Sequence, residues 1–323
     1  GLQVLVARHG KVVYNKSFGY HTFIDTIPVE NSNLYDVASM TKILSTLPLL
    51  MELEEHKEFI LESTLGSLVP KLKKTNKNKL QVKEVLSHYG RLQPWVPFYI
   101  ATLDSVKKPS SIYYRAKDTL NFNIKVANNL YLRNDYKDSI FNTIAKTDLL
   151  PRKNYKYSDL SFFIFKDFIE KYYKKDLNIL TQDHFYKSIG ANRMSYLPLN
   201  KYGLNEIIPS EVDDYYRYQI IQGNVHDMGA AMQGGIGGHA GLFSNANDVA
   251  KIMQMYLQRG SYGGERYLKP ETIDKFNHQY YAEHQVRKGV GFDKPQIKES
   301  EKATCGCVSS QSFGHSGFTG TYT

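Results

Sequence analysis

The sequence predicts a two-lobed protein of the α/β (α+β) class, in which both chain ends build a sheet and a helical lobe lies between them. Three observations favour this class. The first residues, LQVLVARHGKVVYNKSFGY, form two β-rich runs around a His-Gly turn, which is typical of a hairpin. Residues 157–175 have the periodicity of a strong amphipathic helix. The last residues, SFGHSGFTGTYT, are rich in Thr and aromatic side chains, as strands are.

The segments nearest to the two ends carry local structural signals. Residues 34–39 (LYDVAS) predict a short strand or loop, and a helix follows with Ser39 near its N-terminus and Pro48 as a site for a kink. After a Gly-rich turn, Asn245 or Asn247 is expected to cap a helix that ends at Gly260.

The middle of the chain, from about residue 53 to 230, has mainly helical patterns separated by polar loops. No internal repeat or disordered linker is evident. We therefore expect a single domain over 1–323, with a sheet lobe of about 1–60 and 240–323 and a helical lobe of about 61–239.

The composition limits the classes of partner. The formal charge of +9 is partly concentrated in the Lys-rich residues 71–79, which could contact a nucleic acid or an anionic surface. No nucleic-acid motif accompanies them, so a solvated loop is the favoured interpretation and no nucleic-acid partner is expected. No run approaches the roughly 18 apolar residues of a membrane span. The first residues lack an initiator Met and a basic leader, so they do not fix the localisation.

Neither a metal site nor a cofactor is predicted. Cys305 and Cys307 form a Cys-x-Cys pair, which is too close for an easy disulfide and too small a set for zinc, so we expect free thiols. The spacing of His226, Asp227 and His239 fits no compact ligand motif.

Ser39 and Lys42 form the candidate catalytic pair. A serine hydroxyl needs a base within hydrogen-bond reach to act as a nucleophile. Residues i and i+3 share one face of a helix, so Lys42 can meet Ser39, and the backbone N–H groups of a helix start favour developing negative charge. The alternative interpretation makes Ser39 a helix cap and Lys42 a surface charge.

Two further motifs accompany this pair in a definite order. Tyr157-Ser158-Asp159 opens the long central helix, and His315-Ser316-Gly317 begins the late strand. Together with the flanking segments VASMTK, VKEVLSHYGRL and GGHAGLFSNANDVAKIMQMYL, this order resembles the class C and DD-peptidase branch of the serine β-lactamase and penicillin-binding-protein superfamily. The resemblance covers nearly the whole chain. It implies a β-lactamase/transpeptidase-like fold, with an antiparallel sheet flanked by helices, a helical lobe, and the active site between the lobes.

The resemblance also implies roles for individual residues. Ser39 would be the acyl nucleophile, and Lys42 would hydrogen-bond it and lower the pKa of Tyr157, the general base and acid. The remaining substrate-binding and oxyanion positions are Asp159, His315, Gly317 and Phe318, with the backbone N–H groups of Ser39 and Phe318 as the oxyanion hole.

Two positions depart from the family pattern. Asp159 stands where the family usually has Asn, and His315 stands where many relatives have Lys. Both changes predict weak antibiotic hydrolysis, and His315 suggests an activity that falls as the pH rises through about 6.5. As alternatives, Tyr157 is an ordinary helix-start aromatic, His315 a structural turn residue, and Asp159 an early-helix acid favoured by the helix dipole.

A narrower resemblance concerns the segments GRLQPWVPFY, NVHDMGAAM and GHAGLFSNANDVAK. They are similar to the serine-hydrolase domain attached to family 3 β-N-acetylglucosaminidases of bacterial envelopes. This implies a fused upstream glycosidase domain and a cell-envelope or periplasmic location. The family's sheet also continues beyond the His-x-Gly strand, so C-terminal strands and a helix are expected to be missing from the chain.

The expected function is therefore a serine hydrolase that forms an acyl-enzyme. Its expected substrates are D-amino-acid peptides, muropeptides or small esters, in a DD-carboxypeptidase, esterase or β-lactamase-like reaction. The alternative from another class is a catalytically inactive module that binds peptidoglycan.

Overall fold

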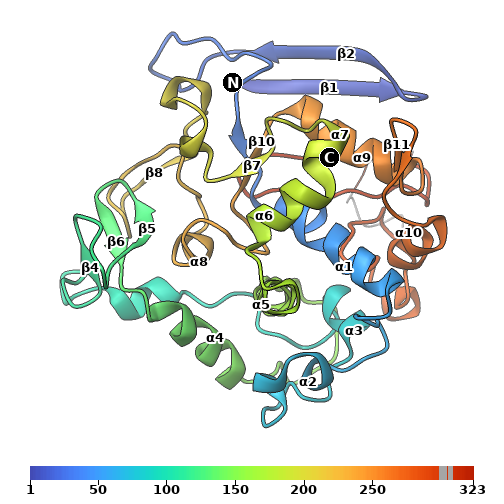
Figure 1. Ribbon diagram of the computed structural model, residues 1–323, viewed down its shortest axis with the longest axis horizontal. Coiled ribbons are helices and arrows are strands. Elements are labelled where there is room, and N and C mark those ends of the chain that lie inside the picture. Colours follow the sequence, from blue (N-terminus) through green and yellow to red (C-terminus); the bar gives the residue numbers. More distant parts are fainter. Residues whose placement is uncertain (298–303, 305–307) are drawn as a thin grey trace.

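Helix α5 (Leu160–Tyr173) occupies the centre of the protein in the computed structural model, which describes residues 1–297, 304 and 308–323 (Figure 1). The helix predicted over 157–175 is thereby confirmed. Its side chains Phe162, Ile164 and Phe165 are all fully buried. A helix that is apolar on most sides needs neighbours on most sides, and this explains why the other elements surround α5.

The N-terminal hairpin is confirmed. Strand β1 (Leu2–Arg8) pairs antiparallel with β2 (Lys11–Phe18), and the turn between them uses His9 and Gly10, both with positive φ. Figure 1 shows the hairpin along one edge of the molecule. The side chain of Gln3 attaches it to the start of α9, because its Oε1 accepts the Ala246 N–H at 2.9 Å.

The other strands are short and form small antiparallel sheets. The sheet beside the hairpin has the order β3-β10-β7, and β3 leads directly to Ser39. The remaining sheets are β4-β6-β5, β8-β9 and β11-β12. The bounds are β3 (Tyr35–Asp36), β4 (Tyr114–Arg115), β5 (Ile124–Ala127), β6 (Leu130–Leu132), β7 (Ser195–Tyr196), β8 (Glu211–Asp213), β9 (Gln219–Ile221), β10 (Leu242–Ser244), β11 (Ser261–Tyr262) and β12 (Glu265–Arg266).

The prediction of a mainly helical segment from 53 to 230 is therefore only partly correct, because β4 to β9 fall within it. These strands have two to four residues each, too few to produce a recognisable alternation of apolar and polar side chains. The helices around α5 are α1 (Leu47–Glu55), α2 (Leu65–Leu68), α3 (Val82–Leu86), α4 (Tyr136–Lys146), α6 (Leu177–Thr181), α7 (Lys187–Ile189), α8 (Met228–Ala231), α9 (Ala246–Leu257) and α10 (Pro270–Asn277).

The predicted cap of α9 is confirmed at Asn245, whose side chain accepts the Asp248 N–H at 2.9 Å. Gly260, with φ +90°, follows the helix end. A side chain is disfavoured at such a φ, which explains the glycine.

One continuous apolar core connects distant parts of the sequence. It includes Leu47 of α1, Phe162 of α5, Ile252 of α9 and Phe292 near the C-terminus, each fully buried. Because this core joins the segment after Ser39 to the helix after Tyr157, it fixes two of the predicted catalytic segments against each other.

The last residues form a tight hairpin rather than the extended strand that their composition predicts. His315 and Thr323 exchange two backbone hydrogen bonds of 3.1 Å, and the Gly317 N–H donates to Thr321 O at 2.8 Å. Gly314 pairs with Asp293 in an antiparallel bridge. The free thiols predicted at Cys305 and Cys307 lie outside the described residues.

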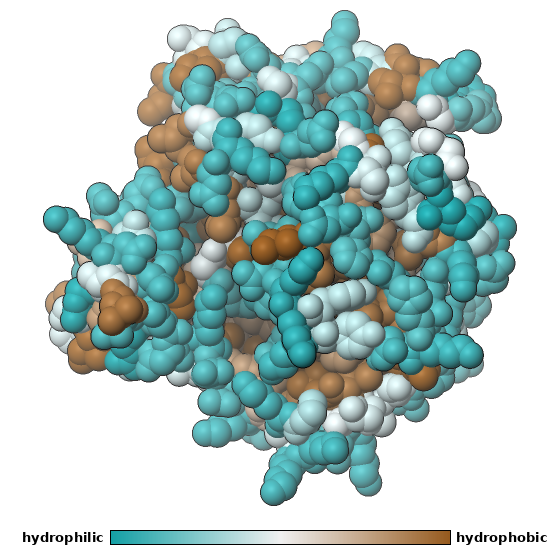
Figure 2. Space-filling view, in the orientation of Figure 1, coloured by the Kyte–Doolittle hydropathy of each residue, from teal (hydrophilic) through white to brown (hydrophobic). Residues whose placement is uncertain are grey.

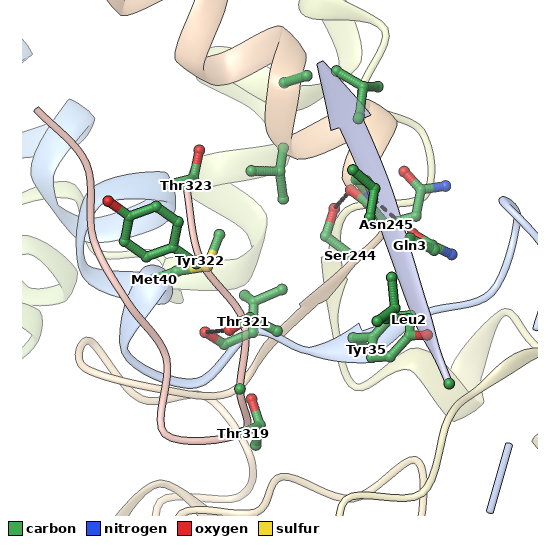
Figure 3. Close-up of a pocket in the computed structure, with 18 residues that line it drawn as sticks. Leu2, Gln3, Tyr35, Met40, Ser244, Asn245, Thr319, Thr321, Tyr322 and Thr323 are labelled. Atoms are coloured by element: carbon green, nitrogen blue, oxygen red, sulfur yellow. Dashed lines mark hydrogen bonds between the residues drawn. The ribbon is translucent and has the colours of Figure 1, made fainter. Parts of the chain in front are cut away.

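A pocket of about 630 Å³ separates the two chain ends. Figure 3 shows strand β1, with Leu2 and Gln3, on one side and Thr319–Thr323 on the other. Met40 and Val37 contribute to its wall, but Ser39, Lys42 and Tyr157 do not. The pocket therefore lies beside the predicted catalytic residues and not around them.

The visible surface is largely hydrophilic (Figure 2). Within the Lys-rich residues 71–79, Lys77 is an exception to the predicted solvated loop. It is fully buried and donates to Thr147 O at 2.6 Å. Among the described residues, no helix is both long and apolar enough to span a membrane.

Candidate active site

The turn that carries Ser39 is strained. Strand β3 is followed by a 3-10 helix, η1 (Ala38–Met40), and a π-helix, η2 (Lys42–Thr46), before α1 begins with Pro48 in its first turn. Ala38 has φ +44°, a conformation that costs a non-glycine residue about 1–3 kcal/mol. The Ala38 N–H donates to Asp36 Oδ1 at 2.8 Å, which holds the turn. The predicted helix is present, but it starts irregularly at Ser39.

Lys42 is a buried side chain and not a surface charge. It has no exposed area, and its Nζ donates to Ser39 Oγ at 2.8 Å and to His239 O at 3.1 Å. The same nitrogen lies 2.7 Å from Asp159 Oδ1. Burial alone would lower the pKa of Lys42, but Asp159 and Tyr157 outweigh burial and the pKa is raised. Lys42 is therefore an ammonium group that donates to Ser39.

Asp159 uses its carboxylate to pair with Lys42. Although it is the N-cap residue of α5, its side chain makes no capping hydrogen bond. Its backbone N–H donates to Pro94 O at 3.0 Å, which fixes the start of the helix to a loop 65 residues earlier in the sequence. The predicted contact between Asp159 and substrate remains a prediction, because the structure directs this carboxylate at the lysine.

Tyr157 lies against Lys42, with Nζ 5.1 Å from the ring centroid. Its buried hydroxyl makes no hydrogen bond of standard geometry within the described residues, although Lys42 and Ser39 lie close enough to lower its pKa as hydrogen-bonding groups. Burial raises the pKa of Tyr157, Lys42 opposes this increase, and Asp159 adds to it. The prediction that Lys42 lowers this pKa gives the correct sign for the lysine, but the net direction is upward because desolvation of the phenolate is larger.

Two histidines flank the phenol. The ring centroid of Tyr157 lies 4.4 Å from that of His88 and 6.1 Å from that of His315. His88 Nδ1 accepts the Ser158 N–H at 3.2 Å, so its Nε2 carries the proton. His315 Nδ1 donates to Ser316 O at 2.7 Å, so its Nε2 is an acceptor. Both Nε2 atoms are buried and unpartnered within the described chain, so the site offers a donor and an acceptor beside Tyr157.

The expected loss of activity as the pH rises through about 6.5 needs correction. Burial, Lys288 and Lys42 hold the pKa of His315 well below 6.5. This side chain is only 2% exposed, and two nearby lysines oppose a third positive charge. His315 is therefore neutral at physiological pH and contributes no cationic charge to the site.

The His-Ser-Gly turn is attached to the segment that carries Ser39. Thr321 Oγ1 donates to Val37 O at 3.2 Å, and Thr319 Oγ1 donates to Asp36 O at 2.6 Å. Phe318 directly precedes the first of these anchors, Thr319, and its side chain is 84% exposed. The chain segments that carry both predicted oxyanion donors are thus held together, whereas the oxyanion role itself remains a prediction.

Asp36 is a positioning residue that the sequence analysis did not identify. In addition to Ala38 and Thr319, it binds His226, whose N–H donates to Asp36 Oδ2 at 2.7 Å. The only signal in the sequence is an acidic residue three positions before Ser39, and acidic residues are common in turns.

Gly317→Ala is expected to separate the two anchored segments. A Cβ at this position would lie 2.5 Å from Val37 O and would also overlap Thr321 Oγ1. The backbone must shift to accommodate the added methyl group. This shift should lower the free energy of unfolding by about 1–3 kcal/mol, measured by urea denaturation. Ser316→Ala, at an exposed neighbouring position, is the control and should leave stability unchanged. Equal stability of Gly317→Ala and the wild type would contradict this packing.

The residues considered as metal ligands separate into two pairs. His226 Nε2 lies 3.1 Å from Glu211 Oε2, and His239 Nε2 lies 2.7 Å from Asp227 Oδ1. Across residues 1–297, 304 and 308–323, no group of three or more His, Cys, Asp or Glu side chains is arranged to hold a metal ion.

The fold and this cluster define a β-lactamase/transpeptidase-like protein, with a serine, a lysine and a tyrosine brought together from separate segments. The sequence model of the family described as Beta-lactamase matches residues 1–323, and the chain belongs to this family of hydrolases.

Relatives support the same assignment. The chain is 26% identical to a Salmonella gallinarum protein named "Putative D-alanyl-D-alanine carboxypeptidase", over 100% of the chain and 74% of that protein. It is 24% identical to an "N-acetylmuramyl-L-alanine amidase" of Bacillus subtilis, over 100% of the chain and 73% of that protein. Among solved structures, a penicillin-binding-protein homologue from Caulobacter crescentus has a TM-score of 0.68 at 14% identity, with 98% of this chain and 80% of that chain covered.

Proposed function

We propose that the protein is a serine acyl-transfer hydrolase that forms an acyl-enzyme at Ser39. The observation that carries the proposal is the position of Lys42 Nζ. This fully buried ammonium lies 2.8 Å from Ser39 Oγ, 2.7 Å from Asp159 and 5.1 Å from the Tyr157 ring centroid. A buried lysine that donates to a serine hydroxyl stabilises the alkoxide that forms during attack.

The proposed reaction begins with attack of Ser39 Oγ on the substrate carbonyl. The serine proton passes to the phenolate form of Tyr157, since Lys42 is already protonated and cannot accept it. The resulting phenol then gives this proton to the leaving amine or alkoxide, and an acyl-enzyme remains. Water then attacks the acyl-enzyme and gives its proton to the Tyr157 phenolate. Tyr157 returns this proton to Ser39 Oγ as the acid product leaves. Because the pKa of Tyr157 is raised, the rate should increase with pH until the phenolate forms.

The negative charge on the substrate oxygen would be stabilised by the backbone N–H groups of Ser39 and Phe318. A donor of this kind contributes about 3–4 kcal/mol to the transition state. The support for this assignment is the pair of threonine side chains that attach the Phe318 turn to Val37 and Asp36.

We infer a substrate with a D-amino-acid or muropeptide acyl group, and a location in the cell envelope. The names of the carboxypeptidase and amidase relatives support both points. The resemblance to a domain attached to glycosidases, with its upstream partner domain, remains a prediction.

A substrate panel tests this proposal. D-Ala-D-Ala peptides, nitrocefin and 4-nitrophenyl acetate would be assayed from about pH 6 to 10 with the wild type. The expected result is turnover of the peptide or the ester that rises with pH, and slower turnover of nitrocefin. No turnover of any of the three at any pH would contradict the proposed hydrolase.

A second candidate is a catalytically inactive module that binds peptidoglycan. It is favoured by one observation: the Asp159 carboxylate balances the charge of Lys42 and raises the pKa of Tyr157, so less of the Tyr157 phenolate is present near neutral pH. Sedimentation with insoluble peptidoglycan, without turnover of the substrate panel, would support the binding module.

Asp159→Asn is expected to increase activity at neutral pH. Removal of this carboxylate removes one cause of the raised Tyr157 pKa, so the phenolate forms at lower pH. The increase of the rate with pH should begin about one pH unit lower than in the wild type. This corresponds to a rate up to about tenfold higher at pH 7. Asp167→Asn on the same helix, where the partner is the surface residue Lys171, is the control. A rise that stays in place or moves to higher pH would be incompatible with this electrostatic role.

A further inference from the structure

A second lysine lies beside Tyr157, on a segment that carries none of the family motifs. Lys288 is 1% exposed, and its Nζ lies 5.1 Å from the Tyr157 ring centroid, the same distance as Lys42 Nζ. Its position is fixed by contact with the Asp293 carboxylate. A buried ammonium is costly unless it is paired, and the partners of Lys288 are the Asp293 carboxylate and the face of the Tyr157 ring.

Without Lys288, the groups beside Tyr157 carry no net positive charge. The positive charge of Lys42 is balanced by Asp159 at 2.7 Å, and His315 is neutral. The charged or titratable groups near the phenol are Lys42, Asp159, Lys288, His88, His315 and Tyr155.

The Asp293 carboxylate does not cancel the charge on Lys288 completely. Arg287 Nη2 lies 3.8 Å from the same Asp293 oxygen, so two cations share one carboxylate. Asp293 also pairs through its backbone with Gly314, directly before His315. The Lys288 segment is thus joined to the turn that completes the site.

We propose that Lys288 is a positioning residue for Tyr157, which packs against the phenol ring and supplies the net positive charge that favours proton transfer from Ser39 to Tyr157. This role rests on the proposed acyl-enzyme function. It assigns to Lys288 a charge that His315 does not carry. Burial and the neighbouring cations Arg287 and Lys42 lower the pKa of Lys288. Lys288 therefore acts on Tyr157 only at pH values below its own pKa, and its effect on the rate should be largest in the lower part of the pH profile.

The test is the pH dependence of acylation in two variants of opposite charge effect. Hydrolysis of 4-nitrophenyl acetate and labelling of Ser39 by a fluorophosphonate probe would be followed from about pH 6 to 10. Lys288→Met removes a positive charge and should shift the increase of the rate to higher pH by about one pH unit. Asp293→Asn removes a negative charge and should move the rise to lower pH. A purely structural role would reduce the rate in both variants without opposite movements of the profile.

Lys288→Arg, which retains the charge, should keep the wild-type profile. Lys294→Met is the matched control, because Lys294 is 5% exposed, six residues away, and donates to Asn277 Oδ1 and Gln311 O. Its profile should also be that of the wild type. If Lys288→Met does not fold, as judged by circular dichroism, the signs for Asp293→Asn and Lys288→Arg decide.

Two failures are distinguishable. Normal labelling of wild-type Ser39, with profiles of Lys288→Met and Asp293→Asn that do not move in opposite directions, overturns the role of Lys288 alone. Absence of labelling in the wild type overturns the proposed function and this inference with it.

Discussion

Ser39→Ala is expected to abolish hydrolysis of every substrate of the wild type, with a loss of at least about 10⁴-fold in kcat/KM. The hydroxyl that accepts the Lys42 hydrogen bond is the only atom removed, and no acyl-enzyme can form without it. The fold should be retained, because the remaining Ala side chain fits the same turn. Initial rates with 4-nitrophenyl acetate and a D-Ala-D-Ala peptide, together with urea denaturation, measure both effects.

The control for this variant is Ser316→Ala, an exposed serine in the late turn. It should retain the wild-type rate, since its carbonyl and not its hydroxyl binds His315. If Ser39→Ala retains its activity while Ser316→Ala loses it, the nucleophile has been assigned to the wrong serine.

Lys42→Met should combine a catalytic loss with a loss of stability. The ammonium contacts Ser39 and Asp159, and its removal leaves the Asp159 carboxylate, 18% exposed, without its partner. Breaking one partner of such a pair typically costs about 3 kcal/mol of the free energy of unfolding. The loss of the hydrogen bond to Ser39 should lower the acylation rate by about 10³-fold.

The double variant Lys42→Met/Asp159→Asn separates these two effects. It removes both charges, so most of the stability should return in urea denaturation. The acylation rate should stay as low as in Lys42→Met, because the donor to Ser39 Oγ is still missing. Recovery of the rate together with stability would show that Lys42 acts only through the packing of the site.

The sequence was sufficient to predict those parts of the site that depend on local spacing. Ser39 and Lys42 are three residues apart and their side chains meet, as the helical spacing predicts, although the backbone there is a 3-10 turn followed by a π-helix. The hairpin at the N-terminus and the long helix after Tyr157 were also predicted, because both have clear periodic patterns.

The electrostatics of the site could not be predicted in this way. Whether Tyr157 has a raised or a lowered pKa depends on how deeply its hydroxyl is buried and on the balance between Lys42 and Asp159. Lys288 lies 131 positions after Tyr157 in the sequence, and nothing in its local sequence distinguishes it from a surface lysine. Contacts of this kind arise from packing between distant segments, which periodicity does not encode.

The most direct test of the account is the location of a covalent adduct. The wild type would be treated with a fluorophosphonate or a penicillin-type probe, digested with trypsin, and analysed by tandem mass spectrometry. Acylation at Ser39 predicts a single modified peptide, residues 17–42, with the added mass on Ser39. An adduct confined to a different residue, or an unmodified folded protein across about pH 6 to 10, would contradict the central claim that Lys42 and Tyr157 make this serine reactive.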